Sequence, residues 1–191
     1  IMDNTVQMNT RENTLNGWGD DTASDHKKCS ANELLNDGVS NLYGGKSVFS
    51  MLPSEIQTII TPVKVISAKG AYYPEGSTTM QFSPAPVVSV SNLFLSCYGE
   101  LWGTTGTPYI NEINKWASIC ERDSNNNITK INRYPNIVSN NTLIARKYLG
   151  TGTDAVTYWT RSANSTTNFT IVNNTNGSEF NYYASTANGA P

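Results

Sequence analysis

The sequence has 191 residues, of which 38% are hydrophobic and 15% are charged, and its formal net charge is −2. This length fits one domain with a single sizeable core, so we expect residues 1–191 to form one domain without help from metals or disulfides. Lys and Arg are scattered rather than clustered, which argues against a nucleic-acid partner. No apolar run approaches the roughly 18 residues of a membrane-spanning helix.

The N-terminal part of the chain, residues 1–29, is polar and rich in turn residues, and it predicts a short strand and a loop with Trp18 in the core. A first helix is predicted to follow. Residues 30–33 read Ser-Ala-Asn-Glu, the pattern of a capping box in which the Ser and Glu side chains bond to each other's backbone amides. Apolar residues then recur at nearly helical spacing through Val39 to Leu42, and Gly44-Gly45 ends the helix.

A second helix is predicted to begin at Pro53, because proline suits a first helical turn and Glu55 favours its positive end. The residues expected to form its buried face are Ile56, Ile59 and Ile60. Pro62 ends this helix. The alternation of apolar and polar residues over 63–67 then predicts a strand.

The middle of the chain mixes helix and strand breakers with short apolar runs. Residues 69–86 contain several Gly and Pro and predict a long loop without regular structure. Strands are predicted at Val87–Val90 and Leu93–Tyr98. A third helix is predicted at Tyr109–Ile119 and a polar turn at Asp123–Asn127.

From residue 143 onward, short β-prone runs alternate with turns. Thr157–Thr160 and Asn168–Val172 predict strands. Asn176-Gly177 predicts the turn of a hairpin, and Phe180–Tyr183 predicts the returning strand. Helices come early and strands late, so the sequence predicts the α+β class.

The residues that most enzymes need are sparse. His26 is the only histidine, and it lies in a charged stretch that we interpret as solvated surface. No zinc-binding, P-loop or dinucleotide-binding motif occurs, so we expect no metal, no cofactor and no enzymatic activity. A carboxylate pair for glycoside hydrolysis stays open, because the fold sets the distance between the two groups. The candidates for it are Glu33, Glu55, Glu100, Asp154 and Glu179.

The three cysteines, Cys29, Cys97 and Cys120, are widely spaced and form no CxxC pair. An odd number of cysteines argues against a disulfide framework. Cys97 and Cys120 lie among apolar residues and are predicted to be buried thiols. The cysteines therefore leave the redox compartment open.

The C-terminal third carries a recognisable pattern: Tyr158-Trp159-Thr160-Arg161-Ser162, then Asn168-Phe169-Thr170-Ile171-Val172, then Gly177, then Asn188-Gly189-Ala190-Pro191. This order resembles a family of bacterial and phage domains of unknown function with the pattern YW-x-RS, NF-x-x-V, a turn glycine and a closing GV-x-PAF. Upstream motifs extend the resemblance over nearly the whole chain, at Asn16-Gly17-Trp18, Leu52–Gln57, Leu93–Ser96 and Glu100–Gly103. Because the closing motif stops at Pro191, we expect the chain to be an excerpt of a longer one.

That family is similar to the C-type-lectin-like group, which includes the variable proteins of diversity-generating retroelements. The resemblance implies a C-type-lectin-like fold with two to three helices packed on short, mostly antiparallel sheets. The calcium-binding signatures of C-type lectins and the cysteine pair of the related formylglycine-generating enzymes are absent, so neither activity is implied. We expect Trp159 to lie in the core and Arg161 to make a buried fork contact with a carboxylate or with carbonyl groups.

A set of Asn, Thr and Tyr residues in the same region has the composition of a binding surface, because Tyr supplies large contact area and Asn supplies adaptable hydrogen bonds. The predicted ligand-binding residues are Asn164, Thr166, Asn168, Asn173, Asn174, Asn176, Asn181, Tyr182 and Tyr183. Diversity-generating retroelements rewrite Asn codons, so the resemblance implies a C-terminal segment rich in Asn. A plain hydrophilic loop is the alternative at each single position, whereas the cluster favours binding.

Three functions are compatible with these observations. The leading hypothesis is a non-enzymatic, adhesin-like domain on a phage fibre or a bacterial surface, which binds a host-cell surface protein or glycan. It implies a virion or extracellular location and no membrane insertion, and it is compatible with a homo-oligomer such as a trimer. The second hypothesis is a decoration or assembly module of a virion or cell surface without a diffusible ligand. The third is a glycan-active enzyme that uses two of the carboxylates named above.

Overall fold

The structure is a computed structural model that describes residues 7–21, 28–38, 43–83, 85–98, 147–148, 155–172 and 179–185. Of residues 43, 147–148, 155–156 and 179–182 it describes the backbone. Its helices are α1 (Ser30–Asn36), the short 3-10 turn η1 (Tyr43–Gly45), α2 (Val48–Met51) and α3 (Ser54–Ile59). Its strands are β1 (Val63–Ala68), β2 (Ala71–Tyr72), β3 (Gln81–Phe82), β4 (Pro86–Ser91), β5 (Lys147–Tyr148), β6 (Ala155–Val156), β7 (Tyr158–Ala163), β8 (Asn168–Val172) and β9 (Glu179–Tyr183).

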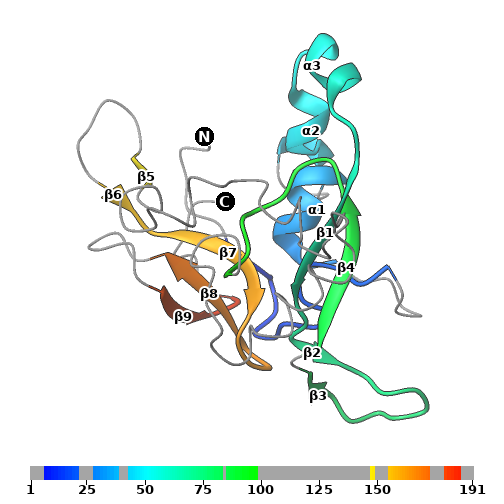
Figure 1. The fold of residues 1–191 in the computed structure, drawn as a ribbon, viewed down its shortest axis with the longest axis vertical. Helices are drawn as coiled ribbons and strands as arrows, with labels where there is room; N and C mark the ends of the chain where they lie inside the picture. Colours follow the sequence, from blue (N-terminus) through cyan, green and yellow to red (C-terminus); the bar gives the residue numbers. More distant parts are fainter. Residues whose placement is uncertain are drawn as a thin grey trace, which may run out of the picture.

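The described strands form four small sheets, and every pairing in them is antiparallel. β1 pairs with β4, β2 with β3 and β5 with β6, while β7, β8 and β9 form a three-stranded sheet with β8 in the centre. Figure 1 shows the β1–β4 pair and the β7–β9 sheet as two separate sheets, with β7 running toward β1. The predicted α+β class and the predicted short antiparallel sheets are confirmed.

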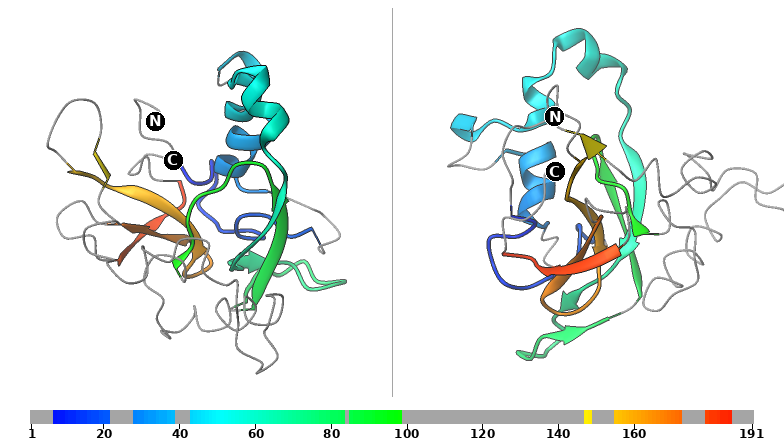
Figure 2. Two further views of the ribbon diagram at one scale, coloured as in Figure 1. Left: turned by 45° about the horizontal axis from the view of Figure 1, so that its top comes forward. Right: turned by 90° about the vertical axis from the view of Figure 1, so that its left-hand side faces the viewer.

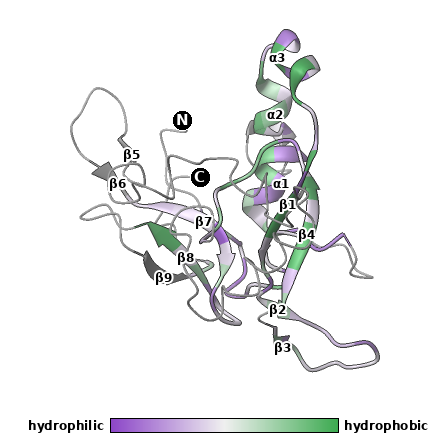
Figure 3. Ribbon diagram, viewed as in Figure 1, coloured by the Kyte–Doolittle hydropathy of each residue, from purple (hydrophilic) through white to green (hydrophobic). Residues whose placement is uncertain are grey.

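The main core lies where these two sheets and α1 meet. It contains the fully buried side chains of Trp18 and Trp159, together with Leu35, Val65 and Phe169. The predictions that Trp18 and Trp159 belong to the core are therefore confirmed. In Figure 3, β8 is mostly hydrophobic whereas β7 is paler and more polar. The two strands nevertheless share this core, because the polar side chains of β7 form hydrogen bonds.

β7 is buried on both faces, since its residues 159–163 are all buried. Its pairing with β8 shifts register between Trp159 and Ala163, as at a β-bulge. At this bulge the Thr160 hydroxyl donates to the Thr170 carbonyl over 2.9 Å and accepts from the Ser162 amide over 3.3 Å. The Thr160 hydroxyl thus satisfies two backbone groups at the bulge. Residue 161 extends its side chain toward the β1–β4 sheet.

Arg161 joins the two sheets through hydrogen bonds. Its Nε and Nη2 atoms donate to the Ile66 carbonyl of β1 over 3.0 and 2.7 Å, and Nη1 donates to the Leu95 carbonyl. The guanidinium also lies over the Phe94 ring, 5.4 Å from its centre. The side chain is fully buried, so the predicted buried fork contact is confirmed, and carbonyl groups are among its partners.

The first helix differs from its prediction at both ends. Its N-cap residue is Cys29, and Ser30 is the first helical residue, so the predicted capping box is wrong. The reason is a tertiary contact: the Ser30 hydroxyl donates to the Asn9 side chain and accepts from the Thr10 amide. The helix ends at Asn36 rather than near residue 43, and residues 39–42 lie outside the described part.

α2 and α3 project beyond α1, away from the β7–β9 sheet, in both Figure 1 and Figure 2. Pro53 is the N-cap residue of α3, so the helix begins one residue later than predicted. The predicted buried face of this helix is wrong for the described structure, because Ile56 is 41% exposed and Ile59 is 73% exposed. This helix has six residues and projects beyond α1, and among the residues that the structure describes it leaves both side chains uncovered.

Three further predictions need correction. Residues 93–98 form no strand, because their backbone bonds to side chains and to the β7 bulge; the Tyr98 amide, for example, donates to the Ser162 hydroxyl over 2.8 Å. Residues 69–86 are an excursion as expected, but β2 and β3 close it as a two-residue ladder. In residues 7–21 the predicted strand is reduced to one isolated bridge, Gly19 to Lys28. The predicted helix at 109–119 and the turn at 123–127 lie outside the described residues.

The cysteine prediction is partly tested. Cys29 and Cys97 are both buried thiols, which confirms the prediction for Cys97. Cys120 lies outside the described residues. Burial raises the pKa of Cys29 to about 12 from an ordinary value of 9.0, so this thiol stays protonated at neutral pH.

Candidate functional site

Three of the predicted ligand-binding residues lie in the turn between β7 and β8 and at the first position of β8. Asn164, Thr166 and Asn168 are half-buried there, and the Asn164 amide donates to the Asn168 carbonyl over 2.8 Å. The Ser165 hydroxyl accepts from the amides of Thr167 and Asn168 over 3.2 and 3.0 Å. These hydrogen bonds define one conformation for the turn and bring the three predicted residues together.

Tyr183 stands beside this turn. It is the last residue of β9 and lies directly opposite Asn168 in the β8–β9 ladder. Residues paired across two antiparallel strands project from the same face of the sheet, so Asn168 and Tyr183 are neighbours on one face. Half of the Tyr183 surface is exposed, at 50%.

The remaining predicted residues are less fully described. Asn181 and Tyr182 lie in β9, opposite Thr170 and Phe169 in the ladder, and only their backbone is described. Asn173, Asn174 and Asn176 lie outside the described residues, as does the predicted turn at Asn176-Gly177. We call Asn164, Thr166, Asn168 and Tyr183 the rim cluster. The described structure brings these four residues to one edge of the β7–β9 sheet.

The rim cluster is fastened to the N-terminal loop by Thr14. The Thr14 amide donates to the Thr166 carbonyl over 3.0 Å, and its hydroxyl donates to the Ser165 carbonyl over 2.6 Å. The same hydroxyl accepts from the Ala71 amide of β2 over 2.8 Å. Thr14 is fully buried, so one side chain connects the loop, the turn and the second small sheet.

A second connection lies at the end of β9. The Ala184 amide donates to the Thr167 carbonyl over 2.8 Å, and the Asn9 amide donates to the Ala184 carbonyl over 2.9 Å. Backbone bonds on both sides therefore hold the residue that follows Tyr183. The rim cluster sits on a framework whose own contacts are made largely by backbone groups.

Behind the N-terminal loop lies a polar hollow of about 300 Å³. From the loop it is lined by Asn9, Thr10, Arg11, Asn13 and Leu15, and across from them by Lys28, Ser30 and Glu33. The sequence reasoning missed this feature, because the lining residues come from a stretch that we interpreted as plain loop and from the start of α1. No local signal in the sequence brings these two stretches together.

The charges around the hollow are unevenly paired. The Lys28 ammonium forms a 2.8 Å ion pair with Asp37. Partial burial raises the pKa of Glu33, the nearby Asp37 carboxylate raises it further, and Lys28 lowers it. Within the described part of the chain, neither the Arg11 guanidinium nor the Glu33 carboxylate has an ion-pair partner.

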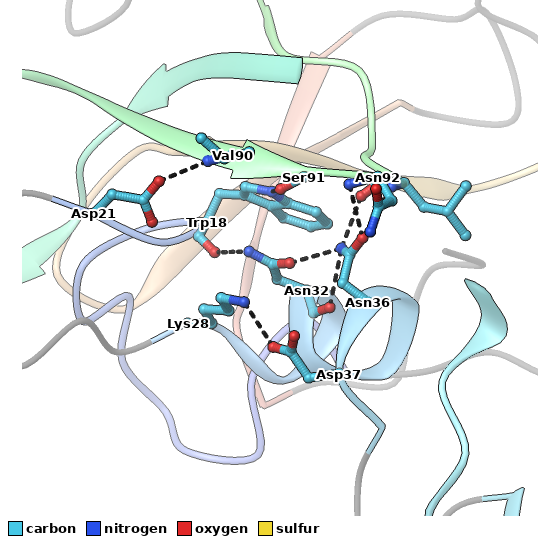
Figure 4. Close-up of polar contacts among 10 residues, drawn as sticks. Trp18, Asp21, Lys28, Asn32, Asn36, Asp37, Val90, Ser91 and Asn92 are labelled. Carbon is cyan, nitrogen blue, oxygen red and sulfur yellow. Dashed lines mark hydrogen bonds and ion pairs between the residues drawn. The ribbon is translucent and has the colours of Figure 1, made fainter. Parts of the chain in front are cut away.

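A network of side-chain amides links α1 to Trp18 and to the residues that follow β4, as Figure 4 shows. The buried Asn32 side chain donates to the Trp18 carbonyl over 2.7 Å and accepts from the Asn36 side chain over 2.8 Å. The Asn36 side chain also binds the Leu93 amide and carbonyl, both over 2.9 Å. The Trp18 indole donates to the Ser91 hydroxyl over 3.2 Å. Part of the Asn content thus serves the scaffold rather than a binding surface.

The residues considered for catalysis are dispersed. Glu33 lines the hollow, whereas Glu55 is exposed on α3 and Glu179 lies in β9 with only its backbone described. His26, Glu100 and Asp154 lie outside the described residues. In the ranges that the structure describes, no three His, Cys, Asp or Glu side chains gather as metal ligands would. Nor does any helix in those ranges have the length and apolar character needed to cross a membrane.

Comparison with known proteins gives one match. No curated protein and no solved structure is significantly similar to this chain. The family model of a domain of unknown function, DUF6273, matches residues 3–190, which is nearly the whole length. The chain therefore belongs to the family of domains of unknown function DUF6273.

Proposed function

We propose that this chain is a non-enzymatic ligand-binding domain with a C-type-lectin-like fold, displayed on a virion or a cell surface. Its partner is a host-cell surface protein or glycan, and its ligand face is the rim cluster. The observation that carries the proposal is the position of Tyr183, a half-exposed ring that lies opposite Asn168 and beside the polar turn. A ring with a polar tip, surrounded by amide and hydroxyl groups, has the chemistry of a recognition surface.

The framework under the rim cluster supports the same proposal. β7 is buried on both faces and Arg161 binds it to β1, so the β7–β9 sheet is anchored to the core of the protein. The turn is held through the carbonyls of Ser165, Thr166 and Thr167. A binding surface benefits from such support, because a preorganised surface loses less conformational entropy when it binds.

The experiment compares two tyrosines of equal exposure. Tyr183→Ala removes the proposed contact, and Tyr73→Ala is the matched control, since Tyr73 is 49% exposed in the β2–β3 excursion and is not part of the rim cluster. Both variants and the wild type are applied to a glycan array and to cells of the source environment. We expect Tyr183→Ala to lose binding while Tyr73→Ala keeps it. Equal binding by all three proteins would overturn the assignment of the ligand face.

The assembly-module hypothesis has one observation in its favour. Met51, Ile56 and Ile59 expose apolar surface on the projecting α2–α3 arm. Exposed apolar patches on a folded protein often mark contacts with other proteins. Sedimentation of the wild type and of the Ile56→Ser, Ile59→Ser double variant tests this second function. A concentration-dependent oligomer that the double variant dissolves would favour assembly, whereas a monomer in both cases would remove it.

A further inference from the structure

The polar hollow shares no lining residue with the rim cluster, and hydrogen bonds connect its two walls. The Ser30 hydroxyl donates to the Asn9 side chain over 3.1 Å and accepts from the Thr10 amide over 3.1 Å. The Asn9 amide group in turn donates to the carbonyl and the side chain of Asn13 over 3.2 and 3.3 Å. These bonds fix the two walls of the hollow relative to each other without any ligand.

Two groups of opposite charge line the hollow without forming an ion pair with any described residue. Asp37 already neutralises Lys28 with an ion pair of 2.8 Å, which Figure 4 shows. Arg11 and Glu33 both line the hollow, and neither has an ion-pair partner among the residues that the structure describes. Arg presents a planar fork that matches a carboxylate, whereas a carboxylate such as Glu33 accepts hydrogen bonds from an ammonium group.

The size and the lining of the hollow restrict the class of ligand that it can bind. A volume of about 300 Å³ is at the lower end of small-molecule sites, so the ligand is small. The described lining residues include one apolar side chain, Leu15, and no aromatic ring against which a sugar could stack. A purely anionic ligand would meet Glu33, and a purely cationic ligand would meet Arg11. A ligand that carries both charges satisfies both groups.

We propose that the hollow binds a small zwitterion of the free α-amino-acid type, with its carboxylate on Arg11 and its ammonium group on Glu33. The Asn, Ser and Thr side chains of the walls supply further hydrogen bonds to a polar ligand of this kind. This site is independent of the proposed function at the rim cluster, because it uses different residues.

The test uses the whole chain and removes one charge at a time from both partners. The common L-amino acids are titrated by calorimetry, and those that bind are repeated as N-acetyl derivatives, which lack the ammonium group, and as methyl esters, which lack the carboxylate. We expect each derivative to bind the wild type roughly tenfold more weakly or worse, the usual loss for a hydrogen bond between charged groups. Glu33→Gln should no longer distinguish the amino acid from its N-acetyl form, and Arg11→Gln should no longer distinguish it from its methyl ester.

Matched controls and contrary outcomes complete the design. Glu75→Gln and Lys46→Gln change exposed charges elsewhere and should keep wild-type affinity. Tyr183→Ala should also keep it, which separates this site from the rim cluster. Unchanged thermal unfolding midpoints of the Arg11 and Glu33 variants show that they fold. Absence of binding at millimolar amino acid, equal binding of all derivatives, or preference for neutral monosaccharides would each overturn the proposal.

Discussion

Thr14→Val is the most informative perturbation of the framework, because it removes one buried hydroxyl and preserves the shape of the side chain. That hydroxyl donates to the Ser165 carbonyl over 2.6 Å and accepts from the Ala71 amide over 2.8 Å. The Ala71 amide is fully buried and cannot turn to water, and an unsatisfied buried donor costs about 1–3 kcal/mol. The half-buried Ser165 carbonyl adds about 1 kcal/mol. We therefore expect Thr14→Val to lower the free energy of unfolding by about 2–4 kcal/mol.

Equilibrium unfolding in urea measures this loss. Thr14→Ser retains the hydroxyl and removes a methyl group, so it should cost only about 1 kcal/mol. Thr61→Val, the same change at an exposed position, should be nearly neutral. Thr14→Val should thus be the least stable of the three variants. A loss below about 0.5 kcal/mol for Thr14→Val, or a larger loss for Thr14→Ser, would refute the role of the hydroxyl.

Three further predictions concern the framework. Gly70→Ala should lower stability by about 1–3 kcal/mol or more in the same urea assay, because the new Cβ would lie 1.9 Å from the Thr14 hydroxyl oxygen; wild-type stability would show that the loop can move aside. Arg161→Met should cost about 2–4 kcal/mol, since two backbone carbonyls lose charge-assisted hydrogen bonds, and a neutral result would contradict that account. The pKa of Cys29 is raised to about 12 in the folded state, so its contribution to stability is fully present below pH 9 and is lost as the pH rises toward 12. Cys29→Ala should therefore flatten the decline in unfolding free energy, about 1.4 kcal/mol per pH unit, that the wild type shows above pH 9.

Four of the strands were predictable because their signals are local. β1, β4, β8 and β9 each contain the residues predicted for them, within two residues at their ends. β-branched and aromatic residues fit the pleated, half-buried surface of a sheet, and these runs contain several of them. The buried fork of Arg161 was equally predictable, since a lone Arg in a β-prone run next to Trp159 must satisfy several donors within the core.

The errors arose where distant segments compete with local ones. The Ser30 hydroxyl bonds to the N-terminal loop rather than to its own helix, so the capping box is lost. The helix ends at Asn36, whose side chain binds the backbone at Leu93. Two residues later, Gly38 has a φ of +88°, and a Cβ there would lie 2.3 Å from the Gly45 carbonyl oxygen. None of these contacts is visible in a window of neighbouring residues.

The two candidate sites differ in the same way: local sequence suggested one of them, and contacts between distant segments form the other. Composition was enough to propose Asn164, Asn168 and Tyr183 as ligand contacts, because Asn and Tyr have the chemistry of recognition surfaces. It could not locate the hollow, where the hydrogen bond between Asn9 and Ser30 connects the loop that carries Arg11 to the helix that carries Glu33. A site assembled from two loops has no periodicity for a sequence pattern to detect.

The hydrogen bonds of the turn separate the positions of the rim cluster that can vary from those that cannot. Thr166 contributes its backbone carbonyl to the framework, and Tyr183 is half-exposed at the end of its strand. The Ser165 hydroxyl, by contrast, holds two backbone amides of the turn, and the Asn168 side chain accepts a 2.6 Å hydrogen bond from Thr167. A change at Thr166 or Tyr183 therefore leaves the support of the turn in place, whereas a change at Ser165 removes part of it. A surface that alters its ligand while keeping its fold requires this separation of contact from support.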